Sequence, residues 1–181
     1  MRGRVVEVES YPGKTDGASH SFKGETERNR AMFMGPGTAY VYSIYGMYHC
    51  FNVSSLGEGA AVLIRSIQPL EGLEVMRRNR EARRKAGAKA MKEKDLCNGP
   101  SKLCQALDID KRLNCSDLIS SEEIWLEEGG EREDVLVQTT RVGIEGSGAE
   151  WAGLELRWYM LGNNHVSVRD RQAEARLDLP R

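Results

Sequence analysis

One arginine stands inside the most continuously apolar stretch of the sequence. The stretch "GAAVLIRSIQP", residues 59–69, predicts a buried β-strand in which Arg65 is the one charged residue. Because a guanidinium always remains charged and has five donors to satisfy, a buried arginine needs a carboxylate or a phosphate beside it. Arg65 therefore points to an anionic partner elsewhere in the chain.

The first strand offers two such partners. In "RGRVVEVESY", residues 2–11, the alternation places Val6 and Val8 on one face and Glu7, Glu9 and Tyr11 on the other. A glutamate that is held by an arginine and open to one water can act as a general base. The pattern alone favours a structural ion pair over a reaction centre, and it leaves Glu7 and Glu9 equally eligible.

Aromatic rings gather in one short segment. Four of the six tyrosines lie within nine residues, although aromatic residues make up 7% of the chain. Tyr40 and Tyr42 share one face of a predicted strand, whereas Tyr45 precedes Gly46 at a predicted hairpin tip. Tyrosines in strands often pack against the neighbouring strand, which accounts for about half of these rings. A ring at a hairpin tip is better placed to stack on a nucleobase, which contributes about 1–3 kcal/mol per base.

Charge and cysteine content narrow the class of protein. The chain has 26 Lys and Arg against 27 Asp and Glu, so its net charge of −1 gives no reason by itself to expect a nucleic-acid partner. Nine basic residues nevertheless cluster in residues 77–94. Such runs more often form a solvated helix face, but the run, together with Arg28, Arg30 and Lys102, is available to neutralise phosphates. The four cysteines form no CxxC pair and no HxxxH or HxE spacing occurs, so neither a structural zinc site nor metal hydrolysis is expected.

The element pattern predicts an α+β protein with a single domain over residues 1–181. Strands are expected at 2–11, 32–55, 59–69, 123–128, 135–145, 156–162 and 165–170. Helices are expected at 70–87, running into the basic residues, and at 97–110, with Ser101 as a possible cap. The expected architecture is a curved, mainly antiparallel sheet with a protruding β-hairpin and surrounding helices. No apolar run approaches the roughly 20 residues of a membrane span, and a reduced intracellular protein is expected.

A series of blocks, taken in order, resembles the alkyladenine (3-methyladenine) DNA glycosylase family of the animal and bacterial type. The blocks are "RGRVVEVESY", "ASHS", "RNRAMFMGPGTAYVYSIYGMYHCFNVSS", "VLIRSIQPLEGLEVMR", "LCNGPSKLCQAL" and "RVGI". The resemblance implies a monofunctional enzyme without a cofactor that excises 3-methyladenine, 7-methylguanine, hypoxanthine and ethenoadenine from duplex DNA. It also implies a monomer whose abasic product passes to further repair enzymes, in the nucleus or in a bacterial-type cytoplasm.

The resemblance also implies residue roles. The family's glutamate lies two residues before a tyrosine, which selects Glu9 over Glu7, and Arg65 corresponds to the arginine that holds the attacking water with it. Tyr45 matches the residue that fills the space left by the extruded nucleotide. The other matching positions fall into two groups: a base pocket formed by Tyr11, His20, Tyr42 and Asn52, the last opposing a purine 2-amino group, and a DNA contact formed by Met47 and Tyr48.

Family members carry a helix and strand pair before this first strand, and that segment is expected to be missing here. A chain beginning at Met1 is therefore expected to have an exposed sheet edge and a reduced core. The alternative to a glycosylase is a damaged-DNA-binding module that keeps the aromatic platform without catalysis. A structural domain with a buried Glu–Arg pair is the third reading.

Overall fold

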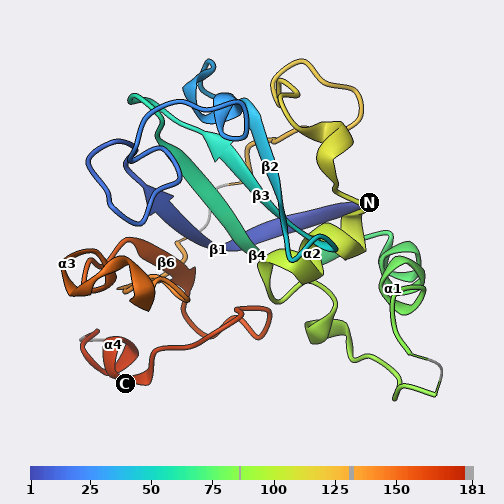
Figure 1. The fold of residues 1–181 in the computed structure, drawn as a ribbon. Helices are drawn as coiled ribbons and strands as arrows, with labels where there is room; N and C mark the ends of the chain where they lie inside the picture. The colour runs from blue at the N-terminus through green and yellow to red at the C-terminus, as the bar shows by residue number, and fades with distance from the viewer. Residues whose placement is uncertain (86, 131–132, 178–181) are drawn as a thin grey trace.

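The computed structural model describes residues 1–85, 87–130 and 133–177. Six strands form one antiparallel sheet with the order β2-β3-β4-β1-β6-β5, and helices and long loops flank it (Figure 1). This arrangement confirms the predicted α+β class and the antiparallel sheet. The strands are β1 (Arg2–Tyr11), β2 (Ala39–Ile44), β3 (Tyr48–Ser54), β4 (Ala61–Glu71), β5 (Leu136–Thr139) and β6 (Arg157–Met160), and the α-helices are α1 (Leu73–Glu81), α2 (Pro100–Leu107), α3 (Ala149–Ala152) and α4 (Arg171–Ala175).

The main core lies between the sheet and α2. Helix α2 packs on β3 and β4, and it begins with Pro100 at a position where a missing backbone N–H costs nothing. Its buried face meets Phe51 of β3 and Ile64 and Ile67 of β4 in one apolar cluster. β4 and β1 are the central pair in the strand order and the two longest strands of the sheet. They carry the residues of the candidate ion pair.

The β2–β3 hairpin confirms the predicted tip. Tyr45 and Gly46 both have positive φ angles, 52° and 72°, and the Met47 N–H donates to the Ile44 carbonyl at 3.3 Å. Two consecutive left-handed residues twist a tight turn in the sense that suits antiparallel strands. In Figure 1 the hairpin runs from the upper part of the sheet toward α2.

Several predicted elements are wrong in extent. Leu70 belongs to β4 rather than to a helix, and α1 ends at Glu81 because Met76 is its one fully buried side chain and nothing apolar follows to pack. Glu71 also belongs to β4, and the predicted helix after Glu81 is turn and coil, apart from Ala86, which lies outside the described residues. Ser101 makes no capping hydrogen bond, since Gly99 occupies the cap position. Met32 and Phe33 belong to a 3-10 helix instead of a strand.

Two predicted strands are loops. Residues 123–128 form no ladder, and Trp125 and Leu126 are exposed there. Residues 165–170 are also irregular, because their backbone groups bind buried side chains: Ser167 donates its N–H to Glu7 at 2.7 Å, and the Val168 carbonyl accepts from Arg157 at 2.7 Å. The strand predicted over 135–145 ends at Thr139.

Candidate active site

Arg65 finds its carboxylate partners on the adjacent strand. β1 and β4 pair with Glu7 opposite Ser66 and Glu9 opposite Leu63, which brings both glutamates beside Arg65. The Arg65 Nη1 lies 3.1 Å from Glu9 Oε1, and its Nε lies 3.3 Å from Glu7 Oε1. All three residues are buried. Arg65 therefore has the anionic partner that the sequence predicts, and both candidate glutamates contact it.

The two glutamates differ in what else binds them. Glu7 accepts hydrogen bonds from Arg157 Nη1 at 2.8 Å, the Ser66 hydroxyl at 3.0 Å and the Ser167 N–H at 2.7 Å. With Arg65, these donors occupy both of its oxygens. None of Arg157, Ser66 and Ser167 lines the cavity described below. Each oxygen of Glu7 thus already has two donors within the protein.

Glu9 is held by three groups that do line the cavity. Its Oε1 forms an ion pair with Arg65 at 3.1 Å and accepts from the Val142 N–H at 2.7 Å, and its Oε2 accepts from the Tyr11 hydroxyl at 3.0 Å. Burial and the Glu9 charge raise the pKa of Tyr11, so that the phenol stays protonated and donates. Glu9 itself lies behind these three groups, and its Oε2 keeps a second lone pair that can accept from another donor such as water.

A cavity of about 480 Å³ lies in front of this carboxylate. That volume is within the range of pockets for small molecules. Its walls come from distant parts of the chain: the loop after β1, the β2–β3 hairpin, β4, the start of α2 and residues 142–147. The lining residues include Tyr11, His20, Met32, Tyr40, Tyr42, Cys50, Asn52, Leu63, Arg65, Ser101 and Val142.

Three rings pack together on one wall of the cavity. The His20 ring lies 4.6 Å from the Tyr42 ring at 70°, and its Nδ1 is 2.9 Å from the Tyr40 hydroxyl. Desolvation and the nearby charge of Arg28 lower the pKa of His20, although the side chain keeps an exposed edge. Burial raises the pKa of Tyr40 to about 12, and burial with the Cys50 thiol raises that of Tyr42. The wall is therefore uncharged at neutral pH.

Asn52 and the hairpin tip complete the predicted set. Asn52 is buried at the cavity, and its Nδ2 donates to the Tyr40 carbonyl at 3.0 Å. This hydrogen bond to the backbone fixes the orientation of the Asn52 side-chain amide. Tyr45 is 88% exposed at the tip, beside the exposed Met47 and Tyr48. A large ring in a left-handed conformation with nothing covering it is costly to the free protein. The structure therefore leaves this ring open to solvent at the end of the hairpin.

Comparisons with known proteins identify the family of the chain. A model of the methylpurine-DNA glycosylase family matches residues 1–164. A human DNA-3-methyladenine glycosylase is 53% identical over 178 residues, covering 96% of this chain and 59% of the relative. The mouse DNA-3-methyladenine glycosylase is 51% identical over 185 residues, with 99% and 55% covered. A protein of Clostridium perfringens (strain SM101), provisionally named 3-methyladenine DNA glycosylase, is 43% identical over 174 residues, with 93% and 84% covered.

The chain belongs to the methylpurine-DNA glycosylase family. It spans between 55% and 59% of the length of the human and mouse relatives. In the part of the chain that the structure describes, no group of three His, Cys, Asp or Glu side chains could hold a metal ion. No helix among the described residues is both long and apolar enough to cross a membrane.

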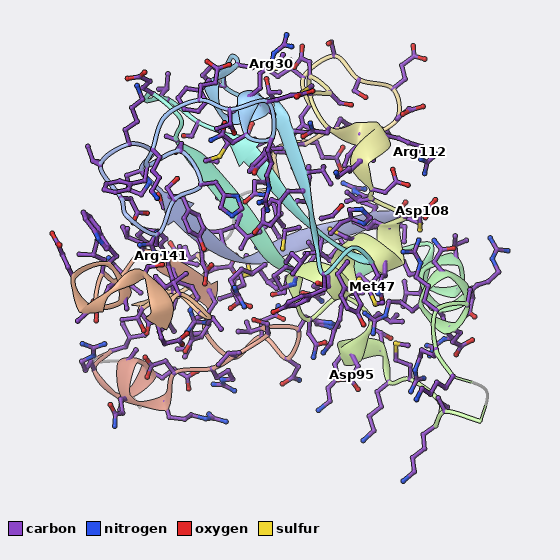
Figure 2. All side chains as sticks on the ribbon, viewed as in Figure 1. Arg30, Met47, Asp95, Asp108, Arg112 and Arg141 are labelled. Carbon is purple, nitrogen blue, oxygen red and sulfur yellow. The ribbon has the colours of Figure 1, made fainter. Side chains whose placement is uncertain are left out.

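The predicted basic residues of this family member are not all gathered at the cavity. The Arg28 guanidinium lies 5.8 Å from the centre of the Tyr42 ring, beside the aromatic wall. Lys102 lies on α2 next to the cavity residue Ser101, and it donates to Asn98 at 2.8 Å. Figure 2 shows Arg30 at the upper end of the molecule, well apart from Met47 near the hairpin tip.

Two charged residues behind the cavity were missed from the sequence. Asp16 and Arg141 form a buried ion pair, and the residue after Arg141 is the Val142 that holds Glu9. Both lie in irregular segments, where no periodicity marks a residue as buried. The one available signal is the block "RVGI", which contains Arg141 and Val142.

Proposed function

We propose that this chain is a monofunctional DNA glycosylase that removes damaged purines from duplex DNA. The observation that carries the proposal is Glu9, a buried carboxylate held by Arg65, Tyr11 and Val142 at the wall of an aromatic cavity. The members of the family just described bear the names of 3-methyladenine glycosylases. The substrates proposed are 3-methyladenine, 7-methylguanine, hypoxanthine and ethenoadenine.

The first step is extrusion of the damaged nucleotide from the helix. Flipping costs a few kcal/mol, least for a damaged or mispaired base. The exposed Tyr45 ring enters the stack at the vacated position, as apolar side chains do in the minor groove. Met47 and Tyr48 extend the contact beside it, and Arg28 and Lys102 neutralise phosphates. The wedge delays the return of the base.

The cavity then selects the base. The rings of Tyr11, His20 and Tyr42 supply electron-rich faces, and an alkylated, electron-poor purine stacks on them favourably. Asn52 is held by the Tyr40 carbonyl, so its position is fixed against an exocyclic 2-amino group, which disfavours normal guanine. Selection thus combines stacking with one rigid polar contact.

Hydrolysis follows at C1′ of the extruded nucleotide. Glu9 and Arg65 hold one water, and Glu9 takes its proton while the water oxygen bonds to C1′. The N-glycosidic bond breaks, and its electron pair leaves with the base. The Glu9 charge also stabilises the oxocarbenium-like sugar in the transition state. The products are the free base and an abasic site.

The proposal places the protein on duplex DNA as a monomer, upstream of enzymes that process abasic sites. A nucleus suits the animal relatives, and a bacterial-type cytoplasm suits the clostridial one. The proposed hydrolysis uses water as the nucleophile and needs no cofactor.

The test is excision from a duplex that contains one hypoxanthine or one ethenoadenine, followed by alkali and detection of strand cleavage. Glu9→Gln should abolish cleavage and retain binding to the lesion duplex. Glu7→Gln is the matched control, since Glu7 is equally buried two residues earlier on β1. It should lower stability by about 3–5 kcal/mol and still excise below its unfolding temperature.

Two results would overturn the proposal. Excision by Glu9→Gln would remove the carboxylate from its role as base. Tight lesion binding by the folded wild type without any abasic product would instead establish a damage-binding module.

A further inference from the structure

The pair of Asp16 and Arg141 is the most enclosed ion pair near the cavity. The Arg141 and Asp16 side chains are 0% and 1% exposed. Nη2 of Arg141 donates to Asp16 Oδ1 at 2.9 Å while Nη1 donates to Oδ2, so the two planar groups meet edge to edge in a bidentate contact. Asp16 Oδ1 also accepts from the Ala18 N–H at 3.0 Å.

The pair joins two segments that both contribute residues to the cavity wall. Asp16 lies in the loop after β1, four residues before His20, whereas Arg141 begins the segment that lines the cavity from Val142 to Ser147. Gly17, the residue after Asp16, contacts α3, which follows that second segment: an added Cβ at Gly17 would lie 2.4 Å from the Trp151 Nε1. Figure 2 shows Arg141 where these loops meet.

Arg141 also contacts the strand that carries Glu9. Its Nη1 donates to the Ser10 carbonyl at 3.1 Å, and its Cζ lies 4.7 Å from the centre of the Tyr11 ring. The next residue, Val142, donates its N–H to Glu9, and the Tyr11 hydroxyl donates to the other Glu9 oxygen. The contacts therefore close into a ring that runs from Glu9 through Tyr11, Arg141 and Val142 back to Glu9.

Packing alone does not account for this arrangement. The Arg141 Nε is buried and has no hydrogen-bond partner among the described residues, which is a cost that a purely structural pair would shed. The guanidinium is instead turned so that its four terminal N–H groups reach Asp16, Ser10 and the Trp151 carbonyl. That orientation sets the Tyr11 ring and the Val142 backbone at the same time.

We propose that Asp16 and Arg141 are positioning residues for the reaction centre, which lock the loop after β1 to the segment 141–147 and thereby aim Glu9. The inference rests on the proposed function and deepens it. Neither side chain lines the cavity, so both act through Tyr11 and Val142. Loss of the pair should misplace the carboxylate while the hairpin that meets DNA stays intact.

The experiment uses Asp16→Asn and Arg141→Lys in the whole chain, with a duplex containing one ethenoadenine. Asp16→Asn keeps the shape and removes the charge, and Arg141→Lys keeps the charge and removes the fork. We expect the single-turnover excision rate to fall by about tenfold to a hundredfold, because displacements of about 1 Å cost that much in rate. Affinity for a duplex with an uncleavable abasic analogue should change by less than about threefold, since that contact is the hairpin's.

Asp170→Asn is the matched control. Asp170 caps α4, accepts from Gln172 and Ala173 at 3.0 Å and binds the Thr139 hydroxyl, so its loss lowers stability away from the cavity. We expect its thermal midpoint to fall while its single-turnover rate stays at the wild-type value. A double-mutant cycle adds a second readout: the Asp16→Asn effect should shrink in a Tyr11→Phe background, where one link of the ring is already absent.

The outcomes separate the inference from the function on which it rests. Wild-type excision with Asp16→Asn and Arg141→Lys rates within twofold of it would overturn the positioning role and leave the glycosylase in place. Rate losses that merely follow the thermal midpoint, as measured against Asp170→Asn, would also overturn it. Absence of excision by the folded wild type would overturn the proposed function itself.

Discussion

Replacement of Tyr45 by glycine should make the free protein more stable and the proposed reaction worse. Tyr45 has a φ of 52°, a conformation that costs an L-residue about 1–2 kcal/mol. Glycine removes that cost but adds about 0.5–1 kcal/mol of unfolded-state entropy. Because the ring is 88% exposed, its loss forfeits little burial. The net gain is about 0.5–1 kcal/mol, or roughly 1–4 °C in thermal midpoint for a domain of this size.

The same substitution removes the ring that fills the vacated stack. A stacked aromatic contributes about 1–3 kcal/mol per base, so the extruded state should become roughly 5- to 150-fold less populated. The assay follows ethenoadenine fluorescence on binding, together with thermal unfolding of the free protein. Tyr45→Ala is the control, since it loses the same ring and keeps the left-handed backbone cost.

Tyr45→Ala should therefore lose the fluorescence change without any gain in thermal midpoint. Equal midpoints for the glycine and alanine variants would refute the strain argument. An unchanged fluorescence signal in both would refute the wedge.

Two further predictions concern single side chains. Desolvation and Arg28 lower the pKa of His20 below its usual 6.5, so the folded state binds this proton less readily than the unfolded chain. The neutral ring's contribution to stability is present above pH 6.5 and is lost as the pH falls through the lower pKa of the folded state. The free energy of unfolding of the wild type should therefore fall relative to that of His20→Gln between pH 7.5 and pH 5. Urea titrations at several pH values measure both, and parallel curves for the two proteins would contradict this prediction. Arg80 has buried Nε and Nη1 atoms with no hydrogen-bond partner among the described residues, and burial lowers its pKa. Arg80→Met should leave the free energy of unfolding unchanged or raised, and a drop beyond about 1 kcal/mol would show that the guanidinium is satisfied.

Residues in regular strands were the predictable part of the site. Arg65 follows four apolar residues in a strand, so its burial and its need for an anion can be read from its neighbours. The position of Tyr45 before Gly46 likewise marks a tight turn with an exposed ring. In both cases the local pattern determines burial, and burial determines the chemistry.

The loops were not predictable in this way. The positions of Asp16, Arg141 and Val142 depend on contacts between residues more than 120 positions apart, such as the Arg141–Asp16 hydrogen bonds. The segment 165–170 has the alternation of a strand, yet its backbone binds Glu7 and Arg157. Tertiary hydrogen bonds to buried charges override local pattern there. The strand pattern likewise left Glu7 and Glu9 equally eligible, since both share one strand face, and only the resemblance to the family selected Glu9.

The charges around Arg65 also bear on how the proposed site would return to its starting state after each reaction. Glu7 and Glu9 carry two negative charges, and Arg65 and Arg157, which bind them, carry two positive ones, so this group of four is electrically neutral at rest. When Glu9 takes a proton from water, the group acquires one net positive charge in a region largely closed to solvent. Glu7, Arg65 and Arg157 all belong to strands of the sheet, so they would keep their places while the base leaves, and the next nucleotide would meet the same arrangement of charges.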